Sequence, residues 1–429
     1  MKKMLLSAAF LAAMTSVSAQ KLTYVPYADN GYLMGTYISS DGRYIAGGDA
    51  GGQGFIYDTQ KGEIKYFVSP ENGDETQDAS TEVRAVNPDG TGVGYVGDKL
   101  CKFDFNTGEY TDLGVNEPAL ANTMSTDGSV IGGFAWDENT YMQHPIYLKD
   151  GVKYDLPMPT STWLGYEANG FGLTGANADG SMFLGYVQDD FAAYPICLWV
   201  LNQDGKTYSV IPVSKRFYDS SIELNGPQPM DYFNGAFMSA NGRWVALSVH
   251  NKDNAEQSYT LARYDVLNDA LEYISCPEAT QTLAYYATAI SDDGTVIGYI
   301  NDEMSNARTG VICLAGDSVA HRLSEAFPGV PELAQLDVNE LNTPCCITPD
   351  GRYISGFGYV DLDDENLCFG TYWIDTKTTD AVDKVSEAAP ATKVVRSYGV
   401  DGKAKRLAAP KGLRLDKLAN GKVKKVVVK

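Results

Sequence analysis

Histidine is scarce in this sequence, and long apolar runs are missing from it. The three histidines, His144, His250 and His321, lie in separate parts of the chain. No His-Glu-x-x-His, Cys-x-x-Cys or Gly-x-Ser-x-Gly motif occurs, so the usual signatures of zinc proteases, thiol oxidoreductases and serine hydrolases are absent. A pair of carboxylates that cleaves glycosides stays open as an alternative, because acidic residues are abundant. These absences favour a protein that acts by binding.

Basic residues are also few over most of the chain. The sequence has 34 Lys and Arg against 55 Asp and Glu, a net charge of −21. Residues 393–429 carry +10 and residues 1–19 carry +2, so residues 20–392 carry −33. An acidic body with a basic tail is therefore expected. Basic tails often bind nucleic acid, but the expected export of this chain argues against such a partner, and we expect none.

Residues 1–19 are typical of a cleavable signal peptide. Lys2 and Lys3 precede a short apolar stretch, and Val17-Ser18-Ala19 resembles a cleavage site. The apolar stretch is shorter than the roughly 20 residues that a membrane span needs. We expect cleavage before Gln20 and an exported protein, extracellular or at the cell surface, with the periplasm as an alternative.

One short motif recurs seven times. It consists of a small polar residue, any residue, Asp or Asn, and Gly, between apolar runs, and it occurs at Ser39–Gly42, Asn87–Gly90, Ser125–Gly128, Asn177–Gly180, Ser239–Gly242, Ser291–Gly294 and Thr348–Gly351. The first side chain can bond to the turn backbone, and Gly adopts positive φ without steric cost. Each motif therefore predicts two strands joined by a tight turn.

The spacing of the motifs indicates a repeat fold. Successive turn Asp or Asn residues lie 48, 38, 52, 62, 52 and 57 positions apart, and periods of about 20–50 residues are typical of solenoids, propellers and arrays. A second hairpin follows most motifs, for example through Lys61-Gly62 and Thr107-Gly108. Four strands per repeat predict an all-β, seven-bladed β-propeller over residues 20–375. A solenoid is the competing architecture.

The last repeat lacks its fourth strand. Strand c is expected at Thr371–Asp375, and nothing strand-like follows it directly. Residues 21–27 resemble a strand and stand before the first repeat, where other repeats carry strand d. We therefore expect the N-terminal strand to close the ring, with Tyr24 opposite Trp373, because this covers an open sheet edge.

Seven cysteines in an exported chain raise the possibility of disulfides. Cys101, Cys197 and Cys313 fall in different repeats, and Cys345 and Cys346 are neighbours. Equivalent strands of non-adjacent blades do not touch, and a bond between neighbouring cysteines is strained. We expect buried free thiols.

The b–c loops and d–a links share one face of the expected ring and carry most of the length variation. Loops on a rigid scaffold often bind ligands. The candidate ligand-binding residues are Trp136, Asp137, Tyr141, Trp163, Tyr166, Asp189, Phe191, Tyr232, Tyr285 and Asp302. Solvation of an acidic surface is the alternative explanation for these loops. No cofactor is expected, except that Asp361, Asp363, Asp364 and Glu365 could hold Ca²⁺, which prefers oxygen ligands.

Residues 376–392 are expected to be a linker, and residues 393–429 a β-rich tail with a hairpin at Asn420-Gly421. Ser397-Tyr398-Gly399, Pro410-Lys411-Gly412 and the Lys-rich end at 422–429 make the tail resemble the sorting tails of type IX secretion cargo. The resemblance implies contact with an outer-membrane secretion machinery. The repeats themselves resemble the Ser-x-Asp-Gly blades of TolB-like and other extracellular-repeat propellers.

Together these features predict an exported recognition module. We expect a monomer that binds a glycan, a peptide or a protein on the loop-rich face. Two alternatives stay open: an enzyme acting on polysaccharides or peptides at the same face, and an envelope assembly scaffold.

Overall fold

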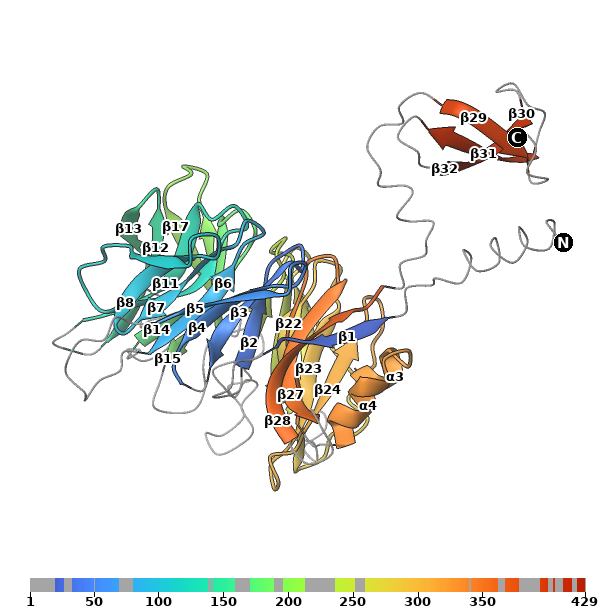
Figure 1. The fold of residues 1–429 in the computed structure, drawn as a ribbon. Coiled ribbons are helices and arrows are strands. Elements are labelled where there is room, and N and C mark those ends of the chain that lie inside the picture. The colour runs from blue at the N-terminus through green and yellow to red at the C-terminus, as the bar shows by residue number, and fades with distance from the viewer. Residues whose placement is uncertain are drawn as a thin grey trace. The chain divides into compact units, whose positions relative to one another are not determined.

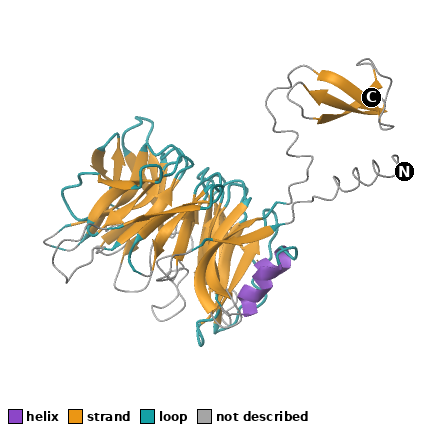
Figure 2. Cartoon of the chain, viewed as in Figure 1, coloured by secondary structure: helices purple, strands orange, loops and turns teal. Residues whose placement is uncertain are grey.

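The structure is a computed structural model, and Figures 1 and 2 show its chain. It describes residues 20–26, 33–49, 51–68, 80–137, 140, 142–158, 170–188, 196–212, 236–250, 259–338, 341–361, 367–377, 394–399, 404–405, 412–418 and 423–428. Two compact units are present, of which Lys21–Thr376 is one. The described residues contain no helix that is long and apolar enough to cross a bilayer.

Residues 21–376 form seven blades of four antiparallel strands. Blade 1 holds β2 (Leu33–Ile38), β3 (Tyr44–Asp49), β4 (Gly54–Asp58) and β5 (Glu63–Phe67). Blade 2 holds β6 (Thr81–Val86), β7 (Thr91–Val96), β8 (Lys99–Asp104) and β9 (Glu109–Asp112). Blade 3 holds β10 (Ala119–Met124), β11 (Val130–Trp136), β12 (Gln143–Lys149) and β13 (Val152–Asp155). Blade 4 holds β14 (Gly170–Ala176), β15 (Met182–Gln188), β16 (Ile196–Leu201) and β17 (Tyr208–Pro212).

The remaining three blades follow the same plan. Blade 5 holds β18 (Ala236–Met238), β19 (Trp244–His250), β20 (Tyr259–Asp265) and β21 (Ala270–Tyr273). Blade 6 holds β22 (Leu283–Ile290), β23 (Val296–Asp302), β24 (Arg308–Cys313) and β25 (His321–Arg322). Blade 7 holds β26 (Asn342–Ile347), β27 (Tyr353–Asp361), β28 (Leu367–Asp375) and the N-terminal β1 (Lys21–Tyr24). The predicted seven-bladed propeller is confirmed, and the solenoid is excluded.

The N-terminal strand closes the ring, as expected, with a register one residue from the predicted one. Thr23 lies opposite Trp373, and Tyr24 lies opposite Tyr372. This register places Leu22 opposite Ile374, and both side chains are buried in the core between blades 6 and 7. Burial of the apolar pair explains the register, because a slip by one residue would turn Leu22 to the other face. Figure 1 shows β1 beside β28.

The seven turn motifs adopt the expected conformation. Their glycines have φ between 68° and 93°. In blade 1 the Ser39 hydroxyl donates to Asp41 at 2.7 Å and accepts from the Tyr44 backbone N–H at 2.9 Å. The motif thus joins the end of strand a to the start of strand b through one side chain, which explains why Ser, Thr or Asn begins it.

Apolar side chains fill the spaces between blades. The described residues contain seven buried hydrophobic clusters, one at each blade interface, and each draws on both neighbouring blades. Strands b and c are almost fully buried, whereas outer strands such as β9, β13 and β21 are mostly exposed. Six cysteines, Cys101, Cys197, Cys276, Cys313, Cys345 and Cys346, are free, as expected.

The sequence interpretation missed two short helices in the link between blades 6 and 7. These are α3 (Leu323–Ala326) and α4 (Pro331–Val338), seen in Figure 2. Leu323, Leu333 and Leu336 contribute to the core between blades 6 and 7. The Asp337 carboxylate accepts hydrogen bonds from Ser324 at 2.7 Å and from the Asn342 amide at 3.0 Å, which fastens the helices to strand a of blade 7.

The C-terminal residues form a sheet of their own. Its strand order is β30 (Ala404–Lys405), β29 (Val394–Gly399), β31 (Gly412–Leu418) and β32 (Val423–Val428). β31 and β32 pair antiparallel, as the expected hairpin requires. The turn residues Asn420 and Gly421 lie outside the described residues, as do the signal segment 1–19 and most of the expected linker.

Candidate functional site

A cavity of about 1080 Å³ runs along the axis of the ring and is lined by strand a of every blade. The side chains of these strands line the cavity in successive layers. The layer that a residue occupies depends on how many positions it stands before the turn motif of its blade. The residue directly before each motif forms an apolar layer: Ile38, Val86, Met124, Ala176, Met238, Ile290 and Ile347. A volume of this size suits a small ligand or one end of a longer one.

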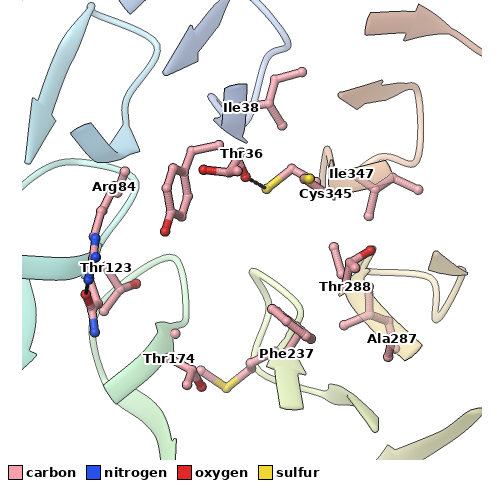
Figure 3. A pocket seen from close by; sticks show the side chains of 18 of the residues that line it. Thr36, Ile38, Arg84, Thr123, Thr174, Phe237, Ala287, Thr288, Cys345 and Ile347 are labelled. Carbon is pink, nitrogen blue, oxygen red and sulfur yellow. Dashed lines mark hydrogen bonds between the residues drawn. The ribbon is translucent and has the colours of Figure 1, made fainter. Parts of the chain in front are cut away.

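The next layer is polar and arises from a β-bulge. In six blades the register of strand a skips the residue three positions before the motif. Bulges re-aim side chains and occur often next to binding sites. The six bulge residues all line the cavity: Thr36, Arg84, Asn122, Thr174, Thr288 and Cys345. We call these six residues the bulge ring. Figure 3 labels five of them, Thr36, Arg84, Thr174, Thr288 and Cys345, around the pocket.

A glycine in strand b accompanies each bulge. A Cβ atom at Gly47 would collide with the carbonyl oxygen of Met34, and the equivalent glycines collide with strand a in the same way. These glycines are Gly47, Gly94, Gly133, Gly185, Gly298 and Gly356. Blade 5 has Leu247 there, opposite Ala236 in a regular pair without a bulge. A glycine five or six residues after the turn Asp is the feature of the sequence that marks each bulge.

Hydrogen bonds link the bulge ring across blades. Arg84 donates to the side-chain Oδ1 of Asn122 at 2.7 Å, and the side-chain Nδ2 of Asn122 donates to the Leu173 backbone carbonyl at 2.8 Å. The Thr174 hydroxyl lies 3.3 Å from the carbonyl oxygen of Ala236. Glu82 accepts from Arg84 at 2.9 Å, so this carboxylate in the cavity wall is neutralised. Arg84, Asn122 and Thr174 are therefore held in place by hydrogen bonds, so this half of the bulge ring is pre-organised.

At the end of the cavity near the turn motifs, backbone hydrogen bonds join neighbouring blades. Thr126 donates to Ala178 at 2.9 Å, Ala178 donates to Ala240 at 2.6 Å, and Asp292 donates to Pro349 at 2.9 Å. At the opposite end, the cavity wall includes Asn301 near the end of strand β23, and Glu303 and Asn306 of the b–c loop of blade 6. The polar lining thus continues to the face on which the sequence interpretation placed the ligand.

The structure describes four of the ten predicted ligand-binding residues. Asp302 and Asp137 lie at b–c turns, where their carboxylates accept backbone N–H bonds from Met304 at 2.9 Å and Thr140 at 2.8 Å. Hydrogen bonds of this kind lower the pKa of Asp302. A turn-forming role explains why an acidic residue recurs at this position. Trp136 packs edge-on against Phe134, with ring centroids 5.0 Å apart.

Tyr285 lies elsewhere than expected. The sequence pattern predicts a position in a d–a link, but Tyr285 belongs to strand β22 and is 1% exposed. Its hydroxyl accepts the Glu278 backbone N–H at 3.2 Å, so the side chain is part of the core between blades 5 and 6. The adjacent Tyr286 lines the cavity instead, since neighbouring strand residues point to opposite faces.

The other predicted residues lie outside the described part of the chain. These are Tyr141, Trp163, Tyr166, Asp189, Phe191 and Tyr232, together with Asp363, Asp364 and Glu365 of the suggested calcium loop. Asp361 ends strand β27, directly before that loop. The ligand-binding role of these residues and the calcium hypothesis stay predictions.

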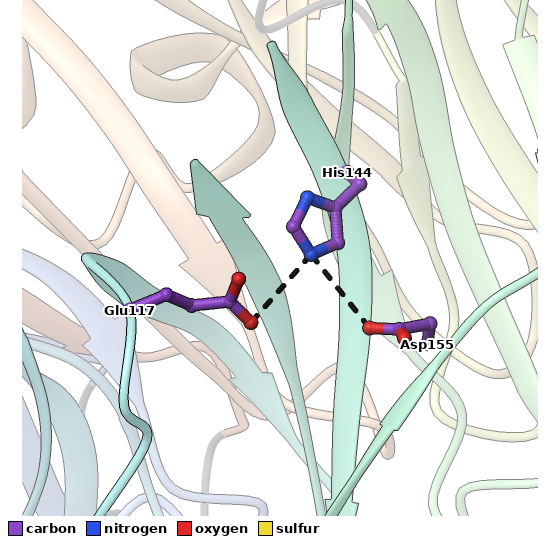
Figure 4. A group of neighbouring side chains, drawn as sticks. All are labelled: Glu117, His144 and Asp155. Atoms are coloured by element: carbon purple, nitrogen blue, oxygen red, sulfur yellow. Dashed lines mark ion pairs between the residues drawn. The ribbon is translucent and has the colours of Figure 1, made fainter. Parts of the chain in front are cut away.

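A second polar group lies in blade 3, away from the cavity lining. His144 Nε2 is 3.7 Å from Glu117 Oε1 and 3.6 Å from Asp155 Oδ1 (Figure 4). These three side chains have the donor types of a metal site. However, the Lys153 ammonium group contacts Glu117 and lies 3.0 Å from Asp155. Burial opposes the charge of Lys153, but the two carboxylates raise its pKa. The group is an ion-pair cluster, because Lys153 supplies the positive charge.

Comparison with known proteins supports the fold. No protein-family model matches the sequence, and no curated protein matches it. An oligogalacturonate lyase in complex with manganese is similar in structure, with a TM-score of 0.55 and 12% identity over 85% of this chain and 95% of the lyase. An oligogalacturonate lyase from Vibrio parahaemolyticus has a TM-score of 0.53 and 12% identity, with the same coverages of 85% and 95%.

TolB from Acinetobacter baumannii is also among the structural neighbours, with a TM-score of 0.36 and 12% identity over 74% of this chain and 70% of TolB. Together with the blades described above, the similarity to the lyases defines the class of protein as a seven-bladed β-propeller. At 12% identity the similarity concerns the fold alone.

Proposed function

We propose that this propeller is a binding protein that holds its ligand in the axial cavity. The observation that carries the proposal is the bulge ring. In six blades the same bulge and the same strand b glycine turn a side chain of strand a toward the cavity. The bulge leaves that residue without a pairing partner in strand b. Hydroxyl, amide and guanidinium groups at one level of a cavity are suited to recognising a polar ligand.

A glycan or a peptide is the ligand class that suits this lining best. Tyr286 and Tyr299 line the cavity with their ring centroids 5.4 Å apart. Tyrosine offers a flat amphipathic surface to sugar rings and to peptide side chains. Entry from the face with the b–c loops is favoured, because backbone hydrogen bonds connect the blades at the opposite end. The predicted loop residues would then contact the parts of the ligand outside the cavity.

A ligand screen tests this proposal. Purified protein is screened by isothermal titration calorimetry against oligosaccharides and short peptides, and hits are repeated with Thr288→Val. Thr288 belongs to the bulge ring, and the substitution preserves shape while removing a hydroxyl. The control is Thr111→Val on the exposed strand β9. Weakened binding in Thr288→Val alone supports the proposal. Equal binding by both variants, or no binding by any tested compound, contradicts it.

The same samples separate binding from the alternatives. Product analysis of each mixture by mass spectrometry shows whether a bound oligosaccharide or peptide is cleaved, and cleavage would favour the enzyme. The oligogalacturonate lyases similar in fold make oligogalacturonate a sensible member of the panel. Specific capture of an envelope protein by the wild-type propeller, unaffected by Thr288→Val, would favour the assembly scaffold.

We further propose that the protein is exported and that residues 393–429 act as a sorting tail. The supporting observations are the signal-like segment 1–19 and the four-stranded C-terminal sheet, β29–β32. Fractionation of cells that express the full chain, compared with a chain ending at residue 392, provides the test. Release or surface display that requires the tail supports the proposal, and identical distribution of both chains contradicts it.

A further inference from the structure

Arginines in the described propeller are almost always neutralised by a carboxylate. Six of the seven form ion pairs: Arg43–Asp58, Arg84–Glu82, Arg243–Asp265, Arg263–Glu272, Arg322–Glu278 and Arg352–Asp375. Arg308 is the exception, since no described carboxylate lies within ion-pair distance of it. In a chain with net charge −21, a guanidinium without such a partner is conspicuous.

Arg308 is held at the wall of the axial cavity. It is the first residue of β24, and its backbone forms a bridge to Leu341 directly before strand a of blade 7. Its guanidinium carbon lies 5.0 Å from the centroid of the Tyr299 ring. Stacking on an aromatic ring leaves the N–H groups at the edge of the guanidinium plane free to donate. The Nε atom of Arg308 is buried and has no hydrogen-bond partner among the described residues.

A second donor without a partner lines the same cavity from blade 7. Thr343 is 4% exposed, and its hydroxyl oxygen has no hydrogen-bond partner among the described residues. Buried polar groups without partners are rare, because each forfeits its hydrogen bonds to water. Two such groups on one cavity wall indicate that something entering the cavity satisfies them.

The charges around Arg308 favour an anion over a neutral group. The carboxylates in the lining are Glu82 and Glu303. Glu82 is neutralised by Arg84, and Glu303 is exposed at the b–c turn of blade 6. The planar guanidinium matches a carboxylate with two parallel hydrogen bonds, a geometry that a point charge such as lysine does not provide.

We propose that Arg308 binds a carboxylate of the ligand, with the Thr343 hydroxyl contributing a hydrogen bond from the neighbouring blade. This inference rests on the proposed function, since it requires that the cavity be the ligand site. The ligand class is thereby narrowed to carboxylated compounds. A uronic acid within an oligosaccharide and the C-terminus of a short peptide share this chemistry.

The test compares acids with their neutral derivatives. Calorimetry with the full chain uses oligogalacturonates and their methyl esters in one arm, and short peptides with free or amidated C-termini in the other. The variants are Arg308→Gln and, as a matched control, Arg352→Gln. Arg352 stacks on Tyr353 in the same way, at 4.8 Å, but does not line the cavity. Thermal unfolding of each variant confirms that it is folded.

We expect wild-type protein and Arg352→Gln to bind at least one of the acids, and Arg308→Gln to bind it at least about tenfold more weakly, since hydrogen bonds to charged groups are the strong ones. The arm that binds identifies the source of the carboxylate. Neutral derivatives that bind as tightly as the acids, or Arg308→Gln binding as wild type does, would overturn the carboxylate assignment while leaving the cavity as the ligand site. Absence of binding by any acid, ester, amide or neutral oligosaccharide would overturn both proposals.

Discussion

Leu22 lies opposite Ile374 at the point where the two ends of the propeller sequence meet. Leu22 is 4% exposed and Ile374 is 0% exposed. One end of the chain supplies the outer strand of blade 7 and the other end supplies its three inner strands. The closing strand therefore contributes apolar contacts as well as backbone hydrogen bonds, and the ring depends on both.

Removing the buried side chain at this closure should destabilise the whole propeller. We expect Leu22→Ala to lower the free energy of unfolding by about 2–4 kcal/mol, the range for large-to-small substitutions in a core. Lys21→Ala, at the exposed neighbour in the same strand, should change it by less than about 0.5 kcal/mol. Urea unfolding followed by tryptophan fluorescence measures both. Equal stability of the two variants would mean that β1 is dispensable.

The bulge ring should depend on the glycine opposite each bulge. At Gly47 a Cβ atom would collide with the Met34 carbonyl, whereas at Gly48 the nearest atom is 3.6 Å away. Gly47→Ala is expected to cost about 1–3 kcal/mol, as overpacking does. Gly48→Ala should be tolerated. The denaturant concentrations at the unfolding midpoints of the two variants test this prediction. If Gly47→Ala is as stable as wild type, strand a can lose its bulge without destabilising the fold.

The ion pair between Arg243 and Asp265 should make the stability of the fold depend on pH. The Arg243 side chain, 2.8 Å from Asp265, lowers the pKa of this carboxyl to about 2, below the roughly 3.9 of an unfolded chain. A lowered folded-state pKa adds stability that is complete above about pH 4 and disappears as the pH falls through about 2. Asp265→Asn should be less stable than wild type at pH 7, with a smaller decline between pH 4 and pH 2.

Thermal unfolding across this pH range tests the prediction. The exposed substitution Glu109→Gln, on outer strand β9, serves as the control. Parallel pH curves for wild type and Asp265→Asn would contradict the assignment of this acid sensitivity to Asp265.

The four fully buried thiols, Cys101, Cys197, Cys276 and Cys313, should be unreactive in the folded protein. Burial raises the pKa of Cys101 to about 11 and that of Cys276 to about 12. Because the thiolate is the reactive form, a raised pKa leaves little of it at pH 8. Native protein should release far less thionitrobenzoate from Ellman's reagent than protein in guanidinium chloride. Asn106→Cys, at an exposed turn, should add one rapidly reacting thiol. Fast reaction of more than three of the seven native thiols would contradict the burial of these four.

The amino-acid sequence by itself determined the number of blades, the turn at each motif and the closure by the N-terminal strand. These features rest on local chemistry: a Ser-x-Asp-Gly turn is stabilised by its own side chains, and a missing strand leaves an edge that must be paired. The sequence also indicated free thiols, since the spacing of Cys101, Cys197 and Cys313 separates them by whole blades.

Only the tertiary structure decided what faces the axis. Tyr285 and Tyr286 are chemically alike, yet one is core and the other lines the cavity, because the bulge at Thr288 sets the direction of strand β22. Arg308 and Arg352 are likewise indistinguishable by their stacking on tyrosine, and differ in whether a carboxylate from another strand reaches them. Contacts between residues far apart in the chain decide which tyrosine lines the cavity and which arginine has a carboxylate partner. No local sequence pattern encodes such contacts.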